Sequence, residues 1–433
     1  MVGNRLPKTA DLIIVGAGIM GSVAALRAAE AGAQVVIIDK EAGPAGEQSG
    51  RAQGALRALG KHGPAIPLTE ESLKIWRGVA NEADAEIVFK GSLSVARRDS
   101  ELPAMVGMIP EFERYGLERP IQLDEQQTRN LIPALEGSLV GSVFRESDGH
   151  CNPRKATMYF AKEAERAGAK FLFGVKALKV LEQDGQIVGL ETNAGTISAR
   201  KIVIASGIWT QILARTVGVK VPIMPVIISG CETTPLPPLF EPSLRSFGFS
   251  GFQRANGRVV VSAGVNARVR HEINLLTFDS PGIWLPRLAA HLPRVRLRLD
   301  RRRIARQLEF GDRWSTHQIQ EETAPKAVDR TLMRGALSFV QDLIPALKEA
   351  HVARYWGGYI DMSPDGVPII DNASCPEGMV IATGMSGHGL ALGPIIGLIL
   401  SQLALEGRSP HSVERFRLAR FVEEKVPIPA NTI

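Results

Sequence analysis

The chain has little cysteine and few aromatic residues, and each shortage excludes a class of protein. Only three of its 433 residues are cysteine, at Cys151, Cys231 and Cys375. Cysteines so few and so scattered cannot build a disulfide framework, a zinc ribbon or a protein-ligated iron–sulfur cluster, and we expect no metal site. Aromatic residues make up 6% of the chain, which argues against a stacking platform for single-stranded nucleic acid. We therefore expect no nucleic-acid partner.

The sequence also has no clear export or membrane-spanning segment. Its longest apolar run, residues 389–405, contains Pro394 and is shorter than the ~20 residues that a spanning helix needs. We predict a buried core helix there. The first ten residues lack the apolar core of a signal peptide. Together with the few cysteines, these features predict a cytoplasmic protein.

Charge is moderately positive and unevenly spread. The formal net charge is +6, and Arg294–Arg306 holds seven arginines in thirteen positions. We predict that residues 285–310 are mainly helical. Two interpretations of the arginines stay open: a solvated element paired with nearby acids, or a contact surface for a partner subunit or the inner membrane face. The nearby acids are Glu309, Asp312, Glu321 and Glu322.

Glycine, by contrast, is abundant, with 43 residues, and its first cluster forms a motif. Gly16, Gly18 and Gly21 have the spacing G-x-G-x-x-G, between a predicted strand (11–15) and a predicted helix (21–32). Gly16 permits a sharp turn, Gly18 lets the backbone approach a pyrophosphate, and Gly21 allows close packing. The helix N-terminus attracts the phosphates. A second strand, 34–39, ends in Asp39, which can bind a ribose. The pattern predicts a dinucleotide site, without distinguishing FAD from NAD.

Periodicity and turn signals predict further elements along the chain. Asn152-Pro153 has the composition of a helix start, and Asn256-Gly257 that of a hairpin turn. A proline-rich stretch, 222–238, is predicted to cross between domains. We expect helices over 105–116, 152–168 and 331–347, and strands over 92–97, 170–174, 178–183, 188–192, 196–199, 201–205 and 380–383.

Four more segments complete a recognisable set: 50–57 (GRAQGALR), 148–153 (DGHCNP), 204–209 (IASGIW) and 382–389 (ATGMSGHG). With the first glycine motif they resemble the flavin-dependent D-amino acid oxidase superfamily, in the branch of sarcosine oxidase, glycine oxidase and bacterial opine or amino-acid dehydrogenases. The resemblance implies an α/β fold, in which a Rossmann-like FAD-binding domain of the glutathione reductase type is interleaved with an α+β, antiparallel-sheet substrate domain. The implied FAD domain comprises 1–90, 146–222 and 346–433, and the substrate domain 91–145 and 223–345.

The resemblance also implies where FAD binds. The 50–54 loop would cross the flavin ring, Val175 would contact adenine through its backbone, and the 387–389 turn would place a helix N-terminus at the ring edge. Relatives with covalent flavin use a cysteine where this chain has Gly358, or a histidine where it has Arg51, so we expect non-covalent FAD. The implied FAD contacts are Gly16, Gly18, Ile19, Met20, Gly21, Asp39, Lys40, Gly50, Arg51, Ala52, Gln53, Gly54, Val175, Ala205, Gly207, Trp209, Gly358, Gly387, His388, Gly389 and Leu390.

The family's reaction removes a hydride equivalent from the carbon beside an amine, and the resulting imine hydrolyses. Relatives hold the substrate carboxylate with an arginine or lysine at positions that are here Ile360 and Ala391, so both usual anchors are missing. We expect Arg57 to hold the carboxylate of a small anionic substrate, which is an amino acid, a secondary amine or an opine-like compound. Further candidates for the active site are Arg254, Tyr359 and His388, with Arg268 and Arg270 as secondary candidates.

The electron acceptor implied by the family is oxygen, or a quinone or carrier protein. Oxidases of the sarcosine type use a lysine on a substrate-domain strand, and residues 252–265 contain none, which favours a dehydrogenase. Two alternatives stay open. One is a dehydrogenase for the C–O bond of a 2-hydroxy acid or glycerol phosphate. The other is a non-catalytic flavin-binding subunit whose basic face docks a partner.

Overall fold

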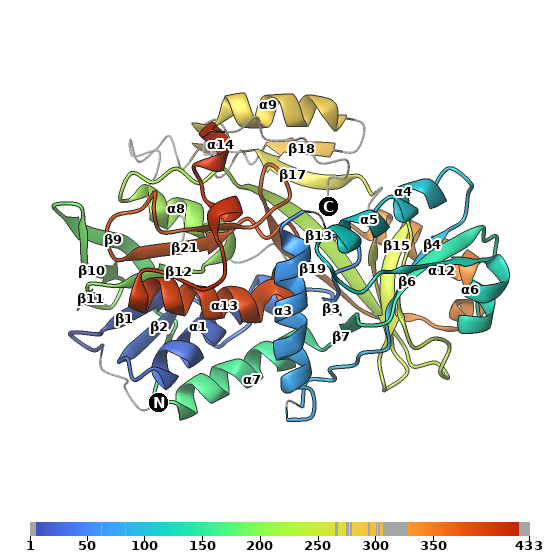
Figure 1. The fold of residues 1–433 in the computed structure, drawn as a ribbon, viewed down its shortest axis with the longest axis horizontal. Helices are drawn as coiled ribbons and strands as arrows, with labels where there is room; N and C mark the ends of the chain where they lie inside the picture. The colour runs from blue at the N-terminus through green and yellow to red at the C-terminus, as the bar shows by residue number, and fades with distance from the viewer. Residues whose placement is uncertain are drawn as a thin grey trace.

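Two large sheets organise the protein, which we describe from a computed structural model (Figure 1). The structure describes residues 6–61, 63–82, 84–264, 267–273 and 328–423, and shorter stretches between 277 and 305. One sheet is six-stranded and largely parallel. The other is ten-stranded and largely antiparallel. The predicted fold class is confirmed.

The six-stranded sheet has the order β20 (Ile369–Asp371), β21 (Met379–Thr383), β12 (Ile202–Ile204), β1 (Leu12–Val15), β2 (Val35–Asp39), β8 (Lys170–Phe173). All neighbours are parallel except the edge pair β20–β21. Its central strands are buried on both faces, so they read as continuous apolar runs. The β1 side chains alternate between two cores: Leu12 and Ile14 belong to one, Ile13 and Val15 to the other.

Helices cover one face of this sheet, and a small sheet covers the other (Figure 1). The helical layer contains α1 (Ile19–Glu30), α7 (Pro153–Arg166) and α13 (Gly389–Glu406), and α3 (Ala65–Gly78) packs on α13. Within the described residues α13 is the one helix long and apolar enough to cross a membrane. However, 72% of it is buried in the protein, as predicted for a core helix. The opposite face carries β9 (Ala177–Gln183), β10 (Gln186–Thr192), β11 (Gly195–Ser198) and α8 (Thr210–Arg215).

The ten-stranded sheet is built around β13 (Met224–Thr233), which pairs over its length with β19 (Val352–Met362). Its other edge contacts β16 (Val259–Ala263) and β17 (Val269–Ile273). Helix α12 (Arg330–Leu343) packs against β13, β15 and β16. The remaining strands of this sheet are β4 (Ser92–Ala96), β5 (Ile121–Asp124), β6 (Gly141–Arg145), β14 (Ser243–Arg245), β15 (Phe249–Gln253) and β18 (Val295–Leu299). The pairs β14–β4 and β17–β18 are parallel.

Short elements complete the fold. The two-stranded pair β3 (Ala55–Leu56) and β7 (Gly149–His150) joins two segments that lie far apart in the sequence. The others are α2 (Gln48–Arg51), α4 (Leu102–Val106), α5 (Ile109–Arg114), α6 (Glu125–Leu131), α9 (Pro281–Ala290), α14 (Arg420–Glu423) and the 3₁₀ turns η1 (Gly207–Trp209), η4 (Pro345–Glu349) and η5 (Glu414–Phe416). The domain boundaries drawn from the sequence stay a prediction.

The proline-rich stretch contains the long strand β13, because residues 226–234 between its prolines are free to pair. Its crossing between domains stays a prediction. Two predicted elements differ from the structure. The predicted helix over 105–116 is two helices, since Pro110 lies in the first turn of α5 and starts a new helix there. The predicted helix over 285–310 ends at Ala290, and VRLRL at 295–299 forms β18, in keeping with its two-residue alternation.

The arginine run is therefore partly an edge strand. On β18, Arg296 contacts Asp329 at 3.4 Å and Arg298 contacts Glu272 at 3.8 Å. These pairings support the interpretation of a solvated element, although the partners differ from those expected. Glu309, Asp312, Glu321 and Glu322 lie outside the described residues. A contact with a partner subunit or membrane stays a prediction.

Candidate active site

A cavity lies where the two sheets meet. Its walls come from the carboxyl ends of β1, β2 and β12, the first turns of α1 and α13, and side chains of β13, β14, β15, β16 and β19. Ligands of open α/β sheets bind at this edge. Of the predicted site residues, the following line the cavity: Gly16, Gly18, Ile19, Met20, Asp39, Lys40, Arg51, Ala52, Gln53, Arg57, Val175, Ala205, Gly207, Trp209, Tyr359, Gly387, His388, Gly389 and Leu390.

The first glycine motif forms a tight turn at one end of the cavity. Gly16 has φ +107°, and a Cβ there would lie 2.5 Å from the carbonyl oxygen of Ala205. A Cβ at Gly21 would lie 1.9 Å from the carbonyl oxygen of Gly16, so Gly21 is a packing residue behind the turn. No side chain caps α1, although the Ile19 N–H donates to Ser49 Oγ at 3.0 Å. The remaining N–H groups at the α1 N-terminus fit a pyrophosphate.

Asp39 stands at the end of β2, beside this turn. Its carboxylate accepts hydrogen bonds from the N–H groups of Ala17 (2.7 Å) and Glu41 (2.8 Å). Burial raises the pKa of Asp39, against the effect of these two bonds. Val175 donates its N–H to the Asp39 carbonyl at 3.1 Å. The next residue, Lys40, is held by Glu41 and Glu47 at 2.7 and 2.6 Å. The arrangement fits the adenosine half of FAD.

One amide ties four separate segments together around the cavity. Gln48 Oε1 accepts from the Ile208 N–H at 3.1 Å, and Gln48 Nε2 donates to Asp361 at 2.9 Å. Asp361 also accepts from Thr383 Oγ1 (3.0 Å) and from the Gly384 N–H (2.7 Å). Burial raises the pKa of Asp361. Helix α2, the turn η1 after β12, strand β19 and the last glycine turn are thus fixed relative to one another.

The last glycine turn leads into α13, whose first residues face the cavity. Gly384 and Gly387 have φ +68° and +81°, conformations that favour glycine. We expected the N–H groups of Gly387, His388 and Gly389 all to face the flavin. The His388 N–H is instead used inside the turn, where it donates to the Met385 carbonyl at 2.8 Å. The first-turn N–H groups of α13 remain oriented as donors for an anionic edge.

Several predicted site residues lie outside this cavity. Gly50, Gly54 and Gly358 are close-packing positions: a Cβ at each would lie 1.9 Å from Ala45 O, 2.3 Å from Cys151 O and 3.1 Å from Arg51 Cβ, respectively. Arg254 lines a separate groove and pairs with Glu86 at 3.0 Å and Glu232 at 2.9 Å. Arg268 is exposed, and Arg270 contacts Asp329 at 3.1 Å. The structure brings none of these three arginines to Arg57.

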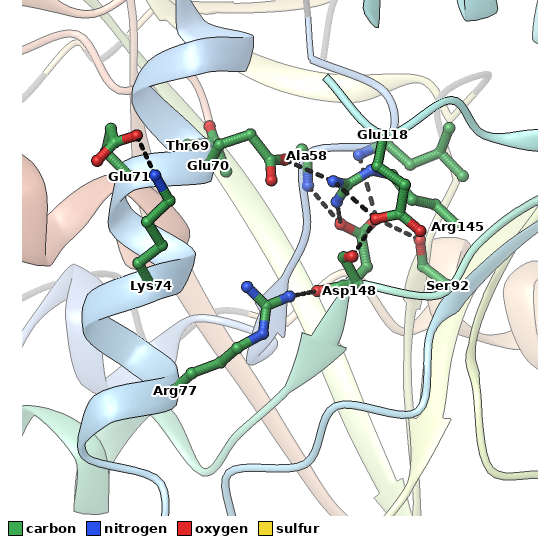
Figure 2. A network of polar contacts seen from close by, with 12 residues as sticks. Ala58, Thr69, Glu70, Glu71, Lys74, Arg77, Ser92, Glu118, Arg145 and Asp148 are labelled. Atoms are coloured by element: carbon green, nitrogen blue, oxygen red, sulfur yellow. Dashed lines mark hydrogen bonds and ion pairs between the residues drawn. The ribbon is translucent and has the colours of Figure 1, made fainter. Parts of the chain in front are cut away.

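Arg57 and Tyr359 do line the cavity. The Tyr359 hydroxyl donates to Glu272 at 2.9 Å, so that its ring orientation is held. Arg57 lies on the segment after β3, whose backbone is held by a buried carboxylate: Asp148 accepts from the N–H groups of Ala58 (2.9 Å) and Leu59 (3.1 Å). Figure 2 shows this network, in which Arg145 also contacts Asp148.

Our reading of the sequence missed four residues that shape the site. Gln48 and Lys61 flank the 50–57 segment, and Asp148 lies in a segment that we had noted without assigning a role. Arg245, at the end of β14, lines the cavity without any motif to mark it. Gln48 and Asp148 form hydrogen bonds with segments more than 80 residues away in the sequence. Local residue spacing cannot predict such contacts.

Comparison with known proteins identifies the family. Residues 11–403 match the family model described as FAD dependent oxidoreductase (DAO). The chain belongs to this family, as predicted, and is an FAD-dependent oxidoreductase. It is 25% identical to the 4-methylaminobutanoate oxidase (formaldehyde-forming) of Paenarthrobacter nicotinovorans over 93% of this chain, but it spans only 44% of that protein. It is 20% identical to the sarcosine oxidase subunit beta of Rhodobacter capsulatus, covering 97% of this chain and 91% of that subunit.

Solved structures share the fold. The L-amino acid deaminase from Proteus vulgaris superposes with a TM-score of 0.85 at 24% identity, covering 97% of this chain and 99% of that one. The L-proline dehydrogenase from P. horikoshii gives a TM-score of 0.79 at 21% identity, covering 96% and 99%. These likenesses confirm the predicted arrangement of two sheets.

Proposed function

We propose that the protein uses FAD to oxidise the C–N bond of an amino acid or secondary amine that carries a carboxylate, and that Arg57 holds this carboxylate. The observation that carries the proposal is that Arg57 lines the same cavity as all three glycine segments. Within the described residues it forms no salt bridge. A planar guanidinium suits a carboxylate, which it can bind through two hydrogen bonds. Relatives whose names describe oxidation of sarcosine and methylaminobutanoate support a C–N bond.

Bound FAD would supply a hydride acceptor for the carbon beside the nitrogen. The turn at Gly16 and Gly18 would hold its pyrophosphate, Asp39 its ribose and the first turn of α13 the edge of its ring. The amine must lose a proton, and burial of the ammonium in the cavity favours its neutral form. The Tyr359 hydroxyl donates a hydrogen bond to Glu272. We therefore assign Tyr359 to shaping the cavity. The imine product then hydrolyses in water.

We further propose that FAD is bound without a covalent link. The two positions at which relatives attach flavin are Gly358 and Arg51, and they are neighbours: a Cβ on Gly358 would lie 3.1 Å from Arg51 Cβ. Neither residue offers a nucleophile for such a link. Acid precipitation should leave all the flavin in the supernatant. Flavin that stays with the pellet would contradict this assignment.

A dehydrogenase is favoured over an oxidase by the absence of lysine from residues 252–265. The measurement is stopped-flow reoxidation of the reduced protein by oxygen and by a soluble quinone. Faster reoxidation by the quinone supports a dehydrogenase, and faster reoxidation by oxygen overturns this preference. A cytoplasmic location is part of the same proposal, and cell fractionation tests it.

Anaerobic bleaching of the flavin absorbance tests the reaction itself. The panel contains D- and L-amino acids, N-alkyl amino acids and 2-hydroxy acids. Bleaching by amines supports the proposal. Bleaching by hydroxy acids alone would instead favour C–O oxidation. No bleaching across the panel would favour the non-catalytic subunit and overturn the proposal.

A further inference from the structure

Three cationic side chains gather at the substrate end of the cavity. Arg57 and Lys61 lie on the segment after β3, and Arg245 ends β14. Arg245 reaches this segment closely, since a Cβ on Gly60 would lie 1.8 Å from Arg245 Nη1. Arg57, Gly60 and Arg245 line the cavity, and Lys61 beside them is only 3% exposed. Arg57 and Arg245 on the cavity wall, with Lys61 buried beside them, carry more positive charge than a single carboxylate needs.

The protein supplies no free carboxylate to this cluster within the described residues. Asp148 is the acid whose charge acts on all three cations. Its two oxygens are already occupied by the N–H groups of Ala58 and Leu59, by Ser92 Oγ and by Arg145 Nη1. A carboxylate has about four acceptor positions, so Asp148 has none left for the cluster. Among the residues that the structure describes, Arg245 makes one hydrogen bond, a long one of 3.4 Å to the Leu59 carbonyl.

Burying such cations without a partner is unfavourable. Burial lowers the pKa of Arg57, of Lys61 and of Arg245, and the charge of Arg57 lowers the pKa of the other two further. An anion bound among them would relieve both effects. The cluster is thus arranged for a ligand with more negative charge than one carboxylate.

Arg245 also faces a second, neighbouring cavity. Gly60, Arg245, Ser386 and His388 line both cavities, which are therefore adjacent. The second cavity has a mostly apolar wall that includes Met108, Trp284, Leu288 and Met362. A ligand arm that extends from Arg57 past Arg245 would find carbon contacts there.

We infer that Arg245, with the buried Lys61 behind it, forms a second anion subsite beside Arg57, and that the substrate is an amine with two carboxylates, such as an N-(carboxyalkyl) amino acid. This inference rests on the proposed function for the reaction, but the subsite itself does not. One carboxylate binds Arg57 near the reacting carbon. The other binds Arg245 at the boundary of the two cavities, and the charge of Lys61 behind it adds to the attraction.

Binding of unreactive probes tests the subsite without turnover. Glutarate and its monoamide, glutaramate, have the same size and differ by one charge. Calorimetric titration of the FAD-loaded protein should give a Kd about tenfold or more lower for glutarate. Lys61→Met and Arg245→Met should each reduce that ratio toward one, whereas Lys74→Met, at an exposed lysine on α3, should leave it unchanged. Because the first comparison uses the wild-type protein, it stays informative even if a variant does not fold.

Anaerobic flavin reduction separates this inference from the proposed function. Iminodiacetate should bleach the flavin at lower concentration than its monoamide. Equal affinities for glutarate and glutaramate, or a preference that survives in both variants, would overturn the subsite. If monocarboxylate amines bleach the flavin and no dicarboxylate preference exists, the proposed function stands and the inference fails. If glutarate is preferred and no amine bleaches the flavin, the subsite stands and the proposed function fails.

Discussion

Arg145 and Asp148 form an ion pair in which both side chains are completely buried, with Arg145 Nη1 2.6 Å from Asp148 Oδ1. Arg145 Nη2 also contacts Glu70 of α3 at 2.8 Å. The Asp148 carboxylate also accepts hydrogen bonds from the backbone N–H groups of Ala58 and Leu59. The pair therefore connects β6 and α3 to the segment that carries Arg57 (Figure 2).

Asp148→Asn should destabilise the protein by about 3 kcal/mol, because removing one partner of a buried pair leaves the other charge poorly compensated. The measurement is the free energy of unfolding from urea titration at pH 7. Glu71→Gln is the control, since Glu71 and Lys74 are 43% and 67% exposed and such pairs contribute less than about 1 kcal/mol. Similar losses in the free energy of unfolding in both variants would contradict a larger stabilising contribution from the buried pair.

Gly21→Ala should weaken FAD binding at least about tenfold, a cost of roughly 1.4 kcal/mol. The added Cβ would lie 1.9 Å from the Gly16 carbonyl oxygen, so the turn that faces the pyrophosphate must move. Fluorescence titration of FAD onto the apoprotein measures the effect.

Gly335→Ala is the matched control for this variant. Gly335 lies in α12, and a Cβ there would meet nothing within 4 Å. Replacing a free helical glycine by alanine stabilises a helix by up to about 1 kcal/mol. FAD affinity should not change in this control. An unchanged FAD affinity in Gly21→Ala would contradict the assignment of the turn.

Arg57→Lys should raise KM for a carboxylate-bearing substrate about tenfold or more, because lysine cannot reproduce a two-point contact. The flavin spectrum and FAD content should stay as in the wild type. Steady-state kinetics with the best amine from the bleaching panel provides KM and kcat. Arg268→Lys is the control, as Arg268 is exposed. An unchanged KM in Arg57→Lys would remove Arg57 as the anchor.

The features predicted best from the sequence are those that depend on short spacings between residues. Gly16, Gly21 and Asp39 lie within one strand–turn–helix–strand unit, whose geometry follows from local packing, and the structure places them as expected. The strand β18 was missed because Arg-rich alternation was taken for a helix. Here the pairing with β17 decides the conformation.

Contacts between distant segments could not be predicted. Arg254 was a candidate for substrate binding, but Glu86 and Glu232 hold it in another groove. Glu86 lies 168 residues from Arg254 in the sequence. Arg245 approaches Gly60, and its strand β14 pairs with the distant β4 in the ten-stranded sheet. The substrate end of the cavity is built by such long-range pairings, whereas the glycine turns are local.

Buried histidine should make the protein sensitive to mild acid. His150 stacks on Phe252, with ring centroids 4.2 Å apart. Burial, helped by the charge of Arg254, lowers the pKa of His150 to about 4. In the unfolded chain a histidine has a pKa near 6.5. Between these values the unfolded chain binds a proton that the folded protein does not, so stability falls as the pH falls.

His150→Gln should remove this contribution. Wild type should lose up to about 1.4 kcal/mol per pH unit from His150 between pH 6.5 and 4, or on the order of 3 kcal/mol in total. The measurement is the free energy of unfolding at pH 7 and pH 4.5 for both proteins. The drop between the two pH values should be smaller in His150→Gln, whatever the variant costs at pH 7. His351→Gln, at an exposed residue, should keep the wild-type drop. Because burial likewise lowers the pKa of His271 to about 4, part of the acid sensitivity should survive in His150→Gln. A drop as large as that of the wild type would show that His150 is not held neutral.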